Sequence, residues 1–222
     1  MTRVQQLVSV TLAGTAVFVA SVAAMHLLQP HLSPVDVAVS YYMNGRFGWM
    51  PRVGLVALGV GSLTLVIAFW QCWVRTRADV GIWLLVVWSI GAIIGGVFPP
   101  DPYGQWSKPP SVSGMIHGVV ALVAFLAFAP AAWLVARTLR RVRPVPAAVR
   151  VLEPLAILYA ASLATFFVCL APVFQNRPPY ALGLVERGLI AVLVTWMVFA
   201  AVGVRACFDG MRHPLDESAG RA

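Results

Sequence analysis

The sequence predicts an all-α fold, a polytopic membrane bundle of six transmembrane helices. Hydrophobic residues make up 60% of the 222 residues and charged residues only 11%, with a mean hydropathy of +0.83. A soluble domain carries about 25% charged residues, so this chain has too little polar surface to cover a globule in water. Six apolar stretches separated by short polar loops complete the pattern.

Each apolar stretch is long enough to cross a hydrocarbon layer of ~30 Å, which takes roughly 20 helical residues. Because backbone groups in lipid must satisfy their own hydrogen bonds, each stretch is predicted to be a helix. The first is longer than the core of a signal peptide, about 7–15 residues, and is expected to be retained. The predicted spans are Val8–Leu28, Val53–Trp73, Val80–Phe98, Met115–Ala136, Leu152–Val173 and Leu184–Ala206.

The basic residues predict the orientation of the bundle. Eleven of them lie at the N-terminus, in the second and fourth loops and in the tail, against five on the opposite side. Short cytoplasmic loops carry the excess of Lys and Arg, so both termini are predicted to be cytoplasmic. The net charge of +8 is therefore explained by basic loop residues that orient the helices in the membrane. These residues form no basic face of the kind that binds nucleic acid. The use of 15 arginines against one lysine is typical of a GC-rich bacterial genome, which predicts a bacterial plasma (inner) membrane.

We expect one six-helix domain over residues 1–207 and a short polar cytoplasmic tail over residues 208–222. The first outer loop contains a candidate short helix on the membrane surface, between the capping signal at Ser33 and the stop signal at Asn44. The glycines of the second and third spans, including Gly59 and Gly96, are predicted to mark close contacts between helices.

Five polar side chains are predicted to reach one membrane depth, just under the outer surface. With the N-terminus inside, the first span ends outward at His26 and the third at Asp101. The fourth span begins outward at His117 and the sixth at Glu186 and Arg187. Ionisable residues in such places are costly, which makes these five the candidate functional residues.

Local physics suggests a role for each residue. Asp101 follows a helix C-terminus, whose dipole disfavours an anion, so we expect it to pair with Arg187. Glu186 and Arg187 point about 100° apart on a helix and should meet different neighbours. We expect His117 in the first turn of its helix, capped by Ser113, with a neutral ring that can hydrogen-bond or ligate.

The sequence is compatible with several interpretations of this polar cluster. It can tie the outer helix ends together, bind a lipid head group or small polar ligand, or form a metal or catalytic site. No metal site is expected from the spacing, and any ligands would be His117, Asp101, His26 and Glu186. Haem ligation by His26 and His117 is a further alternative. The three cysteines indicate no disulfide framework, and no cofactor follows from the sequence.

Short motifs resemble a known bacterial family of six-helix membrane proteins, domain of unknown function 998. They are Ser40-Tyr41-x-x-x-Gly45-x-x-Gly48-Trp49, Phe98-Pro99-x-Asp101, His117, and Gly183-Leu184-x-x-Arg187. The resemblance covers roughly residues 10 to 205. The family usually shows Phe-Pro-Thr-Asp, where this chain has Pro100 and keeps Asp101. The resemblance implies the same topology and polar residues, and it implies no activity.

The sequence therefore predicts an integral membrane protein that contacts membrane lipids and binds a lipid head group or small polar ligand in an outer-facing pocket. The alternative is a metal-dependent intramembrane hydrolase acting on a lipid, with His117 and Asp101 in the site.

Overall fold

The computed structural model describes residues 2–72, 80–105, 107–141, 145–175 and 177–219. Within these ranges every regular element is helical, as predicted. The elements are α1 (Arg3–Leu28), η1 (Val39–Met43), α2 (Trp49–Cys72), α3 (Val80–Val97), α4 (Val112–Leu139), α5 (Ala147–Arg150), α6 (Leu152–Leu170), η2 (Ala171–Gln175) and α7 (Leu182–Ala219).

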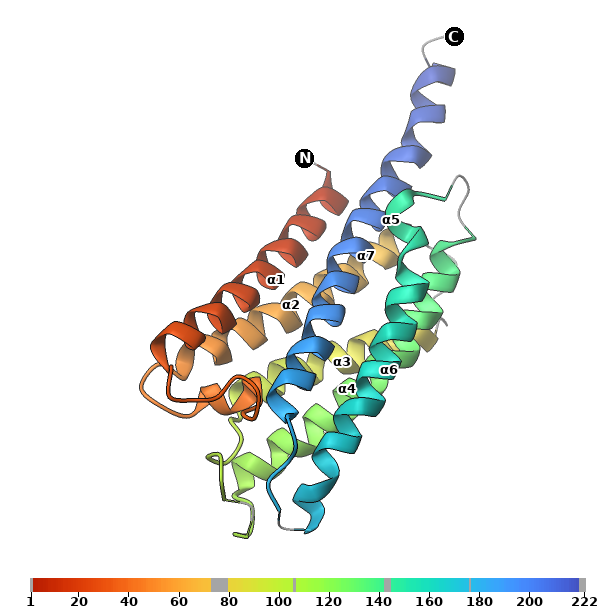
Figure 1. Cartoon of the computed structure of the whole chain (residues 1–222). Helices are drawn as coiled ribbons and strands as arrows, with labels where there is room; N and C mark the ends of the chain where they lie inside the picture. Colours follow the sequence, from red (N-terminus) through yellow and green to blue (C-terminus); the bar gives the residue numbers. More distant parts are fainter. Residues whose placement is uncertain (1, 73–79, 106, 142–144, 176, 220–222) are drawn as a thin grey trace.

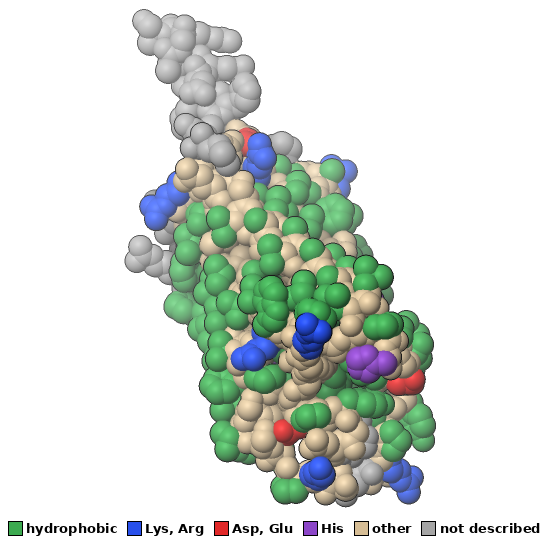
Figure 2. Space-filling model, turned by 90° about the vertical axis from the view of Figure 1, so that its left-hand side faces the viewer, with side chains coloured by type: hydrophobic (Ala, Val, Ile, Leu, Met, Phe, Trp, Pro, Cys, Tyr) green, Lys and Arg blue, Asp and Glu red, His purple; other side chains and the backbone are tan. Residues whose placement is uncertain are grey.

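Within the described residues six helical stretches are long and apolar enough to cross a membrane, which confirms the predicted number. They are α1, α2, α3, α4, the continuous run Ala147–Val173 that contains α5 and α6, and α7. Figure 2 shows one face of the molecule, where hydrophobic side chains lie between charged side chains near the upper end and others spread over the lower half. Many large apolar side chains are exposed along the helices, as lipid contact requires.

The helices close into a ring. Along the chain α1 packs on α2, α2 on α3, α3 on α4, α4 on α6 and α6 on α7, and α7 returns to α1 and α2. Both termini lie at one end of this ring, and η1 lies at the other end with the α3–α4 loop and the start of α7 (Figure 1). We call the second end the η1 end.

Aromatic side chains fill the middle of the ring. The Phe128 ring lies 4.7 Å from the ring of Tyr159 and 5.3 Å from those of Trp88 and Trp196, measured between centroids. Edge-on aromatic contacts of this kind stabilise a core beyond the apolar area they bury. All four of these side chains are buried in the core of the bundle.

The predicted close contacts are confirmed at Gly59 and Gly96, whereas a Cβ at Gly95 would make only ordinary contacts. A Cβ at Gly59 would lie 2.8 Å from the Ser89 carbonyl oxygen, and one at Gly96 would lie 2.8 Å from that of Arg52. Both distances are too short for any side chain. The two glycines therefore let α2 and α3 approach backbone to backbone, which is how small residues pack helices in lipid.

The first loop differs from its prediction. The Ser33 hydroxyl accepts from the Asp36 N–H, as a cap would, but only a local turn follows. The helical segment is the five-residue 3-10 helix η1, which begins at Val39. Its apolar start is buried in the bundle, and this tertiary contact overrides the local capping signal. A position on the membrane surface stays a prediction.

Two helix boundaries also differ. The N-cap of α4 is Ser111, whose hydroxyl accepts from the Gly114 N–H, so His117 lies in the second turn. The Ser113 hydroxyl, predicted as the cap, instead donates to the Pro99 carbonyl at 2.8 Å. At the other end of the chain α7 continues to Ala219, through most of the predicted tail.

Candidate functional site

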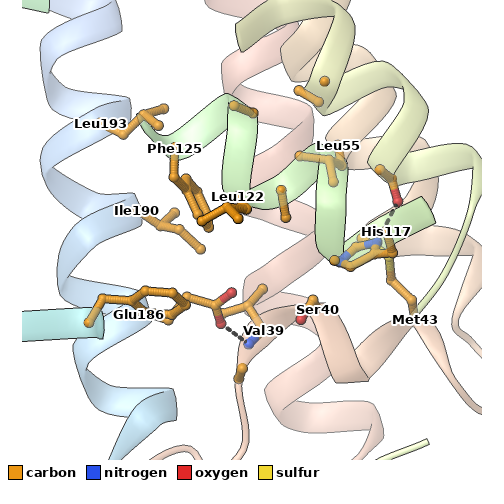
Figure 3. A pocket seen from close by; sticks show the side chains of 18 of the residues that line it. Val39, Ser40, Met43, Leu55, His117, Leu122, Phe125, Glu186, Ile190 and Leu193 are labelled. Carbon is orange, nitrogen blue, oxygen red and sulfur yellow. Dashed lines mark hydrogen bonds between the residues drawn. The ribbon is translucent and has the colours of Figure 1, made fainter. Parts of the chain in front are cut away.

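A pocket of about 210 Å³ lies inside the η1 end of the ring. Residues of α1, η1, α2, α3, α4, α6 and α7 line it, and nearly all of them are apolar. The exceptions are grouped near the η1 end: Ser40, Tyr41, His117 and Glu186. Figure 3 shows Glu186, Val39 and Ser40 below the apolar side chains of Phe125, Ile190 and Leu193, with His117 on the far wall.

The pocket extends about two helical turns into the bundle. On α4 its wall runs from His117 to Phe125, and on α7 from Leu182 to Leu193. At 1.5 Å per residue, eight residues of α4 correspond to about 12 Å of depth. Leu122 lines the pocket and is 45% exposed. The pocket wall on α4 therefore includes a side chain that the bundle does not enclose.

His117 is buried, with 7% of its surface exposed, and its ring is held by the end of α3. The Nδ1 atom lies 2.8 Å from the Phe98 carbonyl oxygen and 3.1 Å from that of Gly95. Both partners are acceptors, so Nδ1 carries the proton and donates to them. Arg52 assists by donating to the Gly96 and Val97 carbonyls. These side chains satisfy carbonyls that a helix C-terminus leaves without partners.

Glu186 is the more deeply buried of the two, with 5% exposure, in the second turn of α7. One carboxyl oxygen accepts a hydrogen bond from the Val39 N–H at the start of η1. Figure 3 shows the second oxygen turned toward the apolar part of the pocket. The positive end of the α7 dipole favours an acidic group there. Glu186 thereby connects η1 to α7 and presents an oxygen to the pocket.

Arg187 points away from the pocket and binds the first loop instead. Its guanidinium donates to the carbonyls of Val37 and Gly183 at 2.9 and 2.8 Å. It also donates to the Tyr42 hydroxyl at 3.1 Å and to His26 Nε2 at 3.0 Å. Glu186 and Arg187 therefore meet different neighbours, as predicted. We call the contacts of Arg187 with these four partners the Arg187 cluster.

His26 belongs to the Arg187 cluster and lies off the pocket wall. Its Nδ1 donates to the Val22 carbonyl at 2.8 Å, so Nε2 is free to accept from Arg187. Its ring lies 5.3 Å from that of Tyr42. Both ring nitrogens are thus occupied, which leaves His26 no lone pair for a metal or haem ligand.

The predicted pair of Asp101 and Arg187 is wrong. Asp101 accepts from the Ser111 N–H at 3.0 Å, at the N-terminus of α4. The α3–α4 loop folds back and places the carboxylate where a helix dipole favours it, so no arginine is needed. The same carboxylate approaches Gly114 so closely that a Cβ there would lie 2.0 Å from it. Asp101 orients the start of α4, and Asn44 holds its loop by donating to the Pro100 carbonyl.

Tyr41 and Ser40 are pocket residues that the reasoning about charged groups missed. Burial, and next the charge of Glu186, raise the pKa of the Tyr41 phenol well above its usual range, which keeps its hydroxyl protonated. The Tyr41 ring also packs edge-on against Tyr103 at 5.3 Å. In the sequence these two residues belong to the Ser40-Tyr41 motif before the second span. That motif indicated a resemblance to a family, but it did not indicate that the two residues line a pocket.

The candidate metal ligands are not gathered in one place. Among the described residues, no three His, Cys, Asp or Glu side chains lie close enough to hold a metal ion. His117 and Glu186 share the pocket, whereas Asp101 binds the start of α4 and His26 binds Arg187.

The fold and site define a six-helix membrane protein with an amphipathic pocket at one end. The chain belongs to the family described as Protein of unknown function (DUF998), whose model matches residues 12–203. This confirms the resemblance found in the motifs. No match to the chain was found among curated proteins or among solved structures.

Proposed function

We propose that the protein binds a membrane amphiphile in the pocket, with one hydrocarbon chain in the apolar part and the polar end near Ser40, His117 and Glu186. The observation that carries the proposal is the pair of buried polar side chains, His117 and Glu186, on the wall of an otherwise apolar pocket. Apolar cavities of about 150 Å³ take up a benzene-sized ligand, and this pocket is larger.

The composition of the wall favours an amphiphile over a small polar ligand. Binding sites combine a mostly apolar lining with a few polar groups that fix orientation. Here the apolar part is too extensive for a purely polar molecule, and it includes Leu122, a side chain that the bundle does not enclose. We favour binding over metal-dependent hydrolysis because the four candidate ligands make separate contacts.

Photolabelling in phospholipid nanodiscs tests this proposal. The probes are hexadecanol and hexadecanoic acid, each with a diazirine at mid-chain. We expect adducts of at least one probe on buried wall residues such as Leu58, Trp88 and Leu193, and their disappearance when the unlabelled compound is added in excess. Unsaturable adducts of both probes, confined to exposed residues such as Val123 and Ile157, would overturn it.

We also propose that the protein lies in a bacterial plasma membrane with both termini in the cytoplasm. The arginine distribution supports this orientation and would place the polar end of the pocket near the outer surface. Exposed Ser107 lies at the η1 end and exposed Ala147 at the end with the termini.

Cysteines introduced at these two positions test the orientation, in a background where the three native cysteines are replaced by alanine. In intact cells an impermeant thiol reagent should label the Ser107→Cys protein and leave the Ala147→Cys protein unlabelled. Both should react after the membrane is permeabilised. The reverse pattern in intact cells would mean that the bundle is inverted.

A further inference from the structure

We propose that the polar end of the bound amphiphile is a hydrogen-bond donor, a hydroxyl or an ammonium group, and that it carries no phosphate. This inference rests on the proposed binding function and specifies its ligand. It follows from the acceptor atoms that the two buried polar side chains of the wall, His117 and Glu186, turn to the pocket beside the hydroxyl groups of Ser40 and Tyr41.

His117 offers an acceptor to the pocket. Its Nδ1 proton is already shared between the carbonyls of Gly95 and Phe98. In the neutral ring the remaining nitrogen, Nε2, then has a lone pair and no proton. Figure 3 shows the two ring nitrogens on different sides, one at the carbonyl and the other facing into the pocket. A ligand that meets Nε2 must bring a hydrogen to it.

Glu186 offers a second acceptor. The Val39 N–H occupies one carboxyl oxygen, and the other faces the pocket. A carboxyl oxygen buried to this degree is costly unless it is hydrogen-bonded. When the carboxyl group is ionised, a donor on the ligand supplies that bond, and an acceptor such as an ether or ester oxygen does not.

The described part of the wall lacks the cationic side chains that hold a phosphate. No Lys or Arg occurs among the described residues that line the pocket. Arg187 follows Glu186 in the sequence, but its guanidinium is engaged with His26, Tyr42 and two carbonyls in the Arg187 cluster. Phosphate recognition uses arginine, lysine or backbone N–H groups, and a phosphate here would meet the Glu186 carboxyl group instead.

Competition against the photoprobes tests the inference with four compounds of the same chain length: hexadecanol, hexadecylamine, hexadecyl methyl ether and hexadecyl phosphate. We expect the alcohol or the amine to displace the probe at about tenfold lower concentration than the ether or the phosphate, since a buried hydrogen bond to a strong acceptor is worth about 1.4 kcal/mol. Which of the two displaces better identifies the head group as hydroxyl or ammonium.

His117→Asn provides the matched variant. The Asn amide nitrogen can replace Nδ1 as donor to the α3 carbonyls, but nothing replaces Nε2. The gap between alcohol and ether should fall to about threefold or less, while His31→Asn, at an exposed histidine off the pocket wall, should leave it unchanged.

These experiments distinguish a failure of the donor inference from a failure of the binding proposal. If the ether or the phosphate displaces the probe as well as the alcohol and the amine, the donor inference is wrong and the binding proposal stands. If neither photoprobe labels the pocket saturably, the binding proposal fails and the inference fails with it.

Discussion

Replacing Arg187 with Gln is expected to lower the free energy of unfolding by about 3–5 kcal/mol, because it removes a charged group that donates four hydrogen bonds. His26, Val37, Gly183 and Tyr42 each lose a donor, and the first loop loses its attachment to α7. Thermal or denaturant unfolding in detergent measures the change. Arg187→Lys should recover only part of the loss, since an ammonium group cannot reproduce the planar fork of donors.

Arg205→Gln is the matched control for this substitution. Arg205 lies on the same helix, 57% exposed, and its Nε is 3.7 Å from the Asp209 carboxylate. An exposed pair of this kind contributes little, and we expect a change of less than about 1 kcal/mol. A similarly small effect of Arg187→Gln would contradict the structural role of the Arg187 cluster.

Double-mutant cycles separate the Arg187 cluster from the pair that the sequence suggested. Arg187→Gln combined with His26→Phe should lose less stability than the sum of the single changes. Combined with Asp101→Asn, it should be additive within about 0.5 kcal/mol, because the two residues share no partner. Coupling of more than about 1 kcal/mol between Asp101 and Arg187 would mean that they do interact.

The helices could be predicted because their signals are local. Six spans follow from segment length, apolar composition and the need to pair backbone groups in lipid. None of these signals depends on which helices contact each other. The five polar residues could also be chosen, since each is an ionisable or imidazole group beside a span. The independent directions of Glu186 and Arg187 followed from helix geometry alone.

The partners of these residues could not be predicted, because a shared depth does not mean contact. In the ring α3 packs on α2 and α4, while α7 packs on α6, α1 and α2, so Asp101 and Arg187 follow or begin helices that are not neighbours. Backbone groups then satisfied both residues: the Ser111 N–H for Asp101 and two carbonyls for Arg187. Backbone partners of this kind cannot be predicted from residue types, because nearly every residue carries the same backbone groups.

The pocket was equally hidden from the sequence. Its wall consists mainly of Leu, Phe, Ala and Gly residues that look like ordinary helix-packing positions, contributed by every membrane-spanning stretch. Sequence reasoning foresaw a polar site between helix ends, whereas the pocket is mostly apolar and holds only two of the five candidates. The difference shifts the expected ligand from a small polar molecule to one with a hydrocarbon chain.

Filling the pocket should abolish binding while leaving the fold intact. Ala121 lines the pocket on α4, and Ala121→Phe adds a ring of about the size that a 150 Å³ cavity accepts. Ligand retained by the protein should fall at least tenfold. Filling a cavity often stabilises a protein by about 0.5–2 kcal/mol, so unfolding in detergent should occur at the same or higher denaturant concentration. Ala121→Leu is the milder variant if the ring is not accommodated.

Val123→Phe is the matched control on the same helix. Val123 is 48% exposed toward lipid and lies outside the pocket wall. It receives the same side chain at nearly the same depth, so any general effect of a phenyl ring on lipid association appears in both variants. Only Ala121→Phe should change the occupancy of the pocket.

Native mass spectrometry of these proteins, released from detergent micelles after loading with hexadecanol, tests the binding claim most directly. We expect one bound alcohol per chain on the wild type and on Val123→Phe, and none on Ala121→Phe. Equal adducts on all three proteins, or no adduct on the wild type, would contradict it.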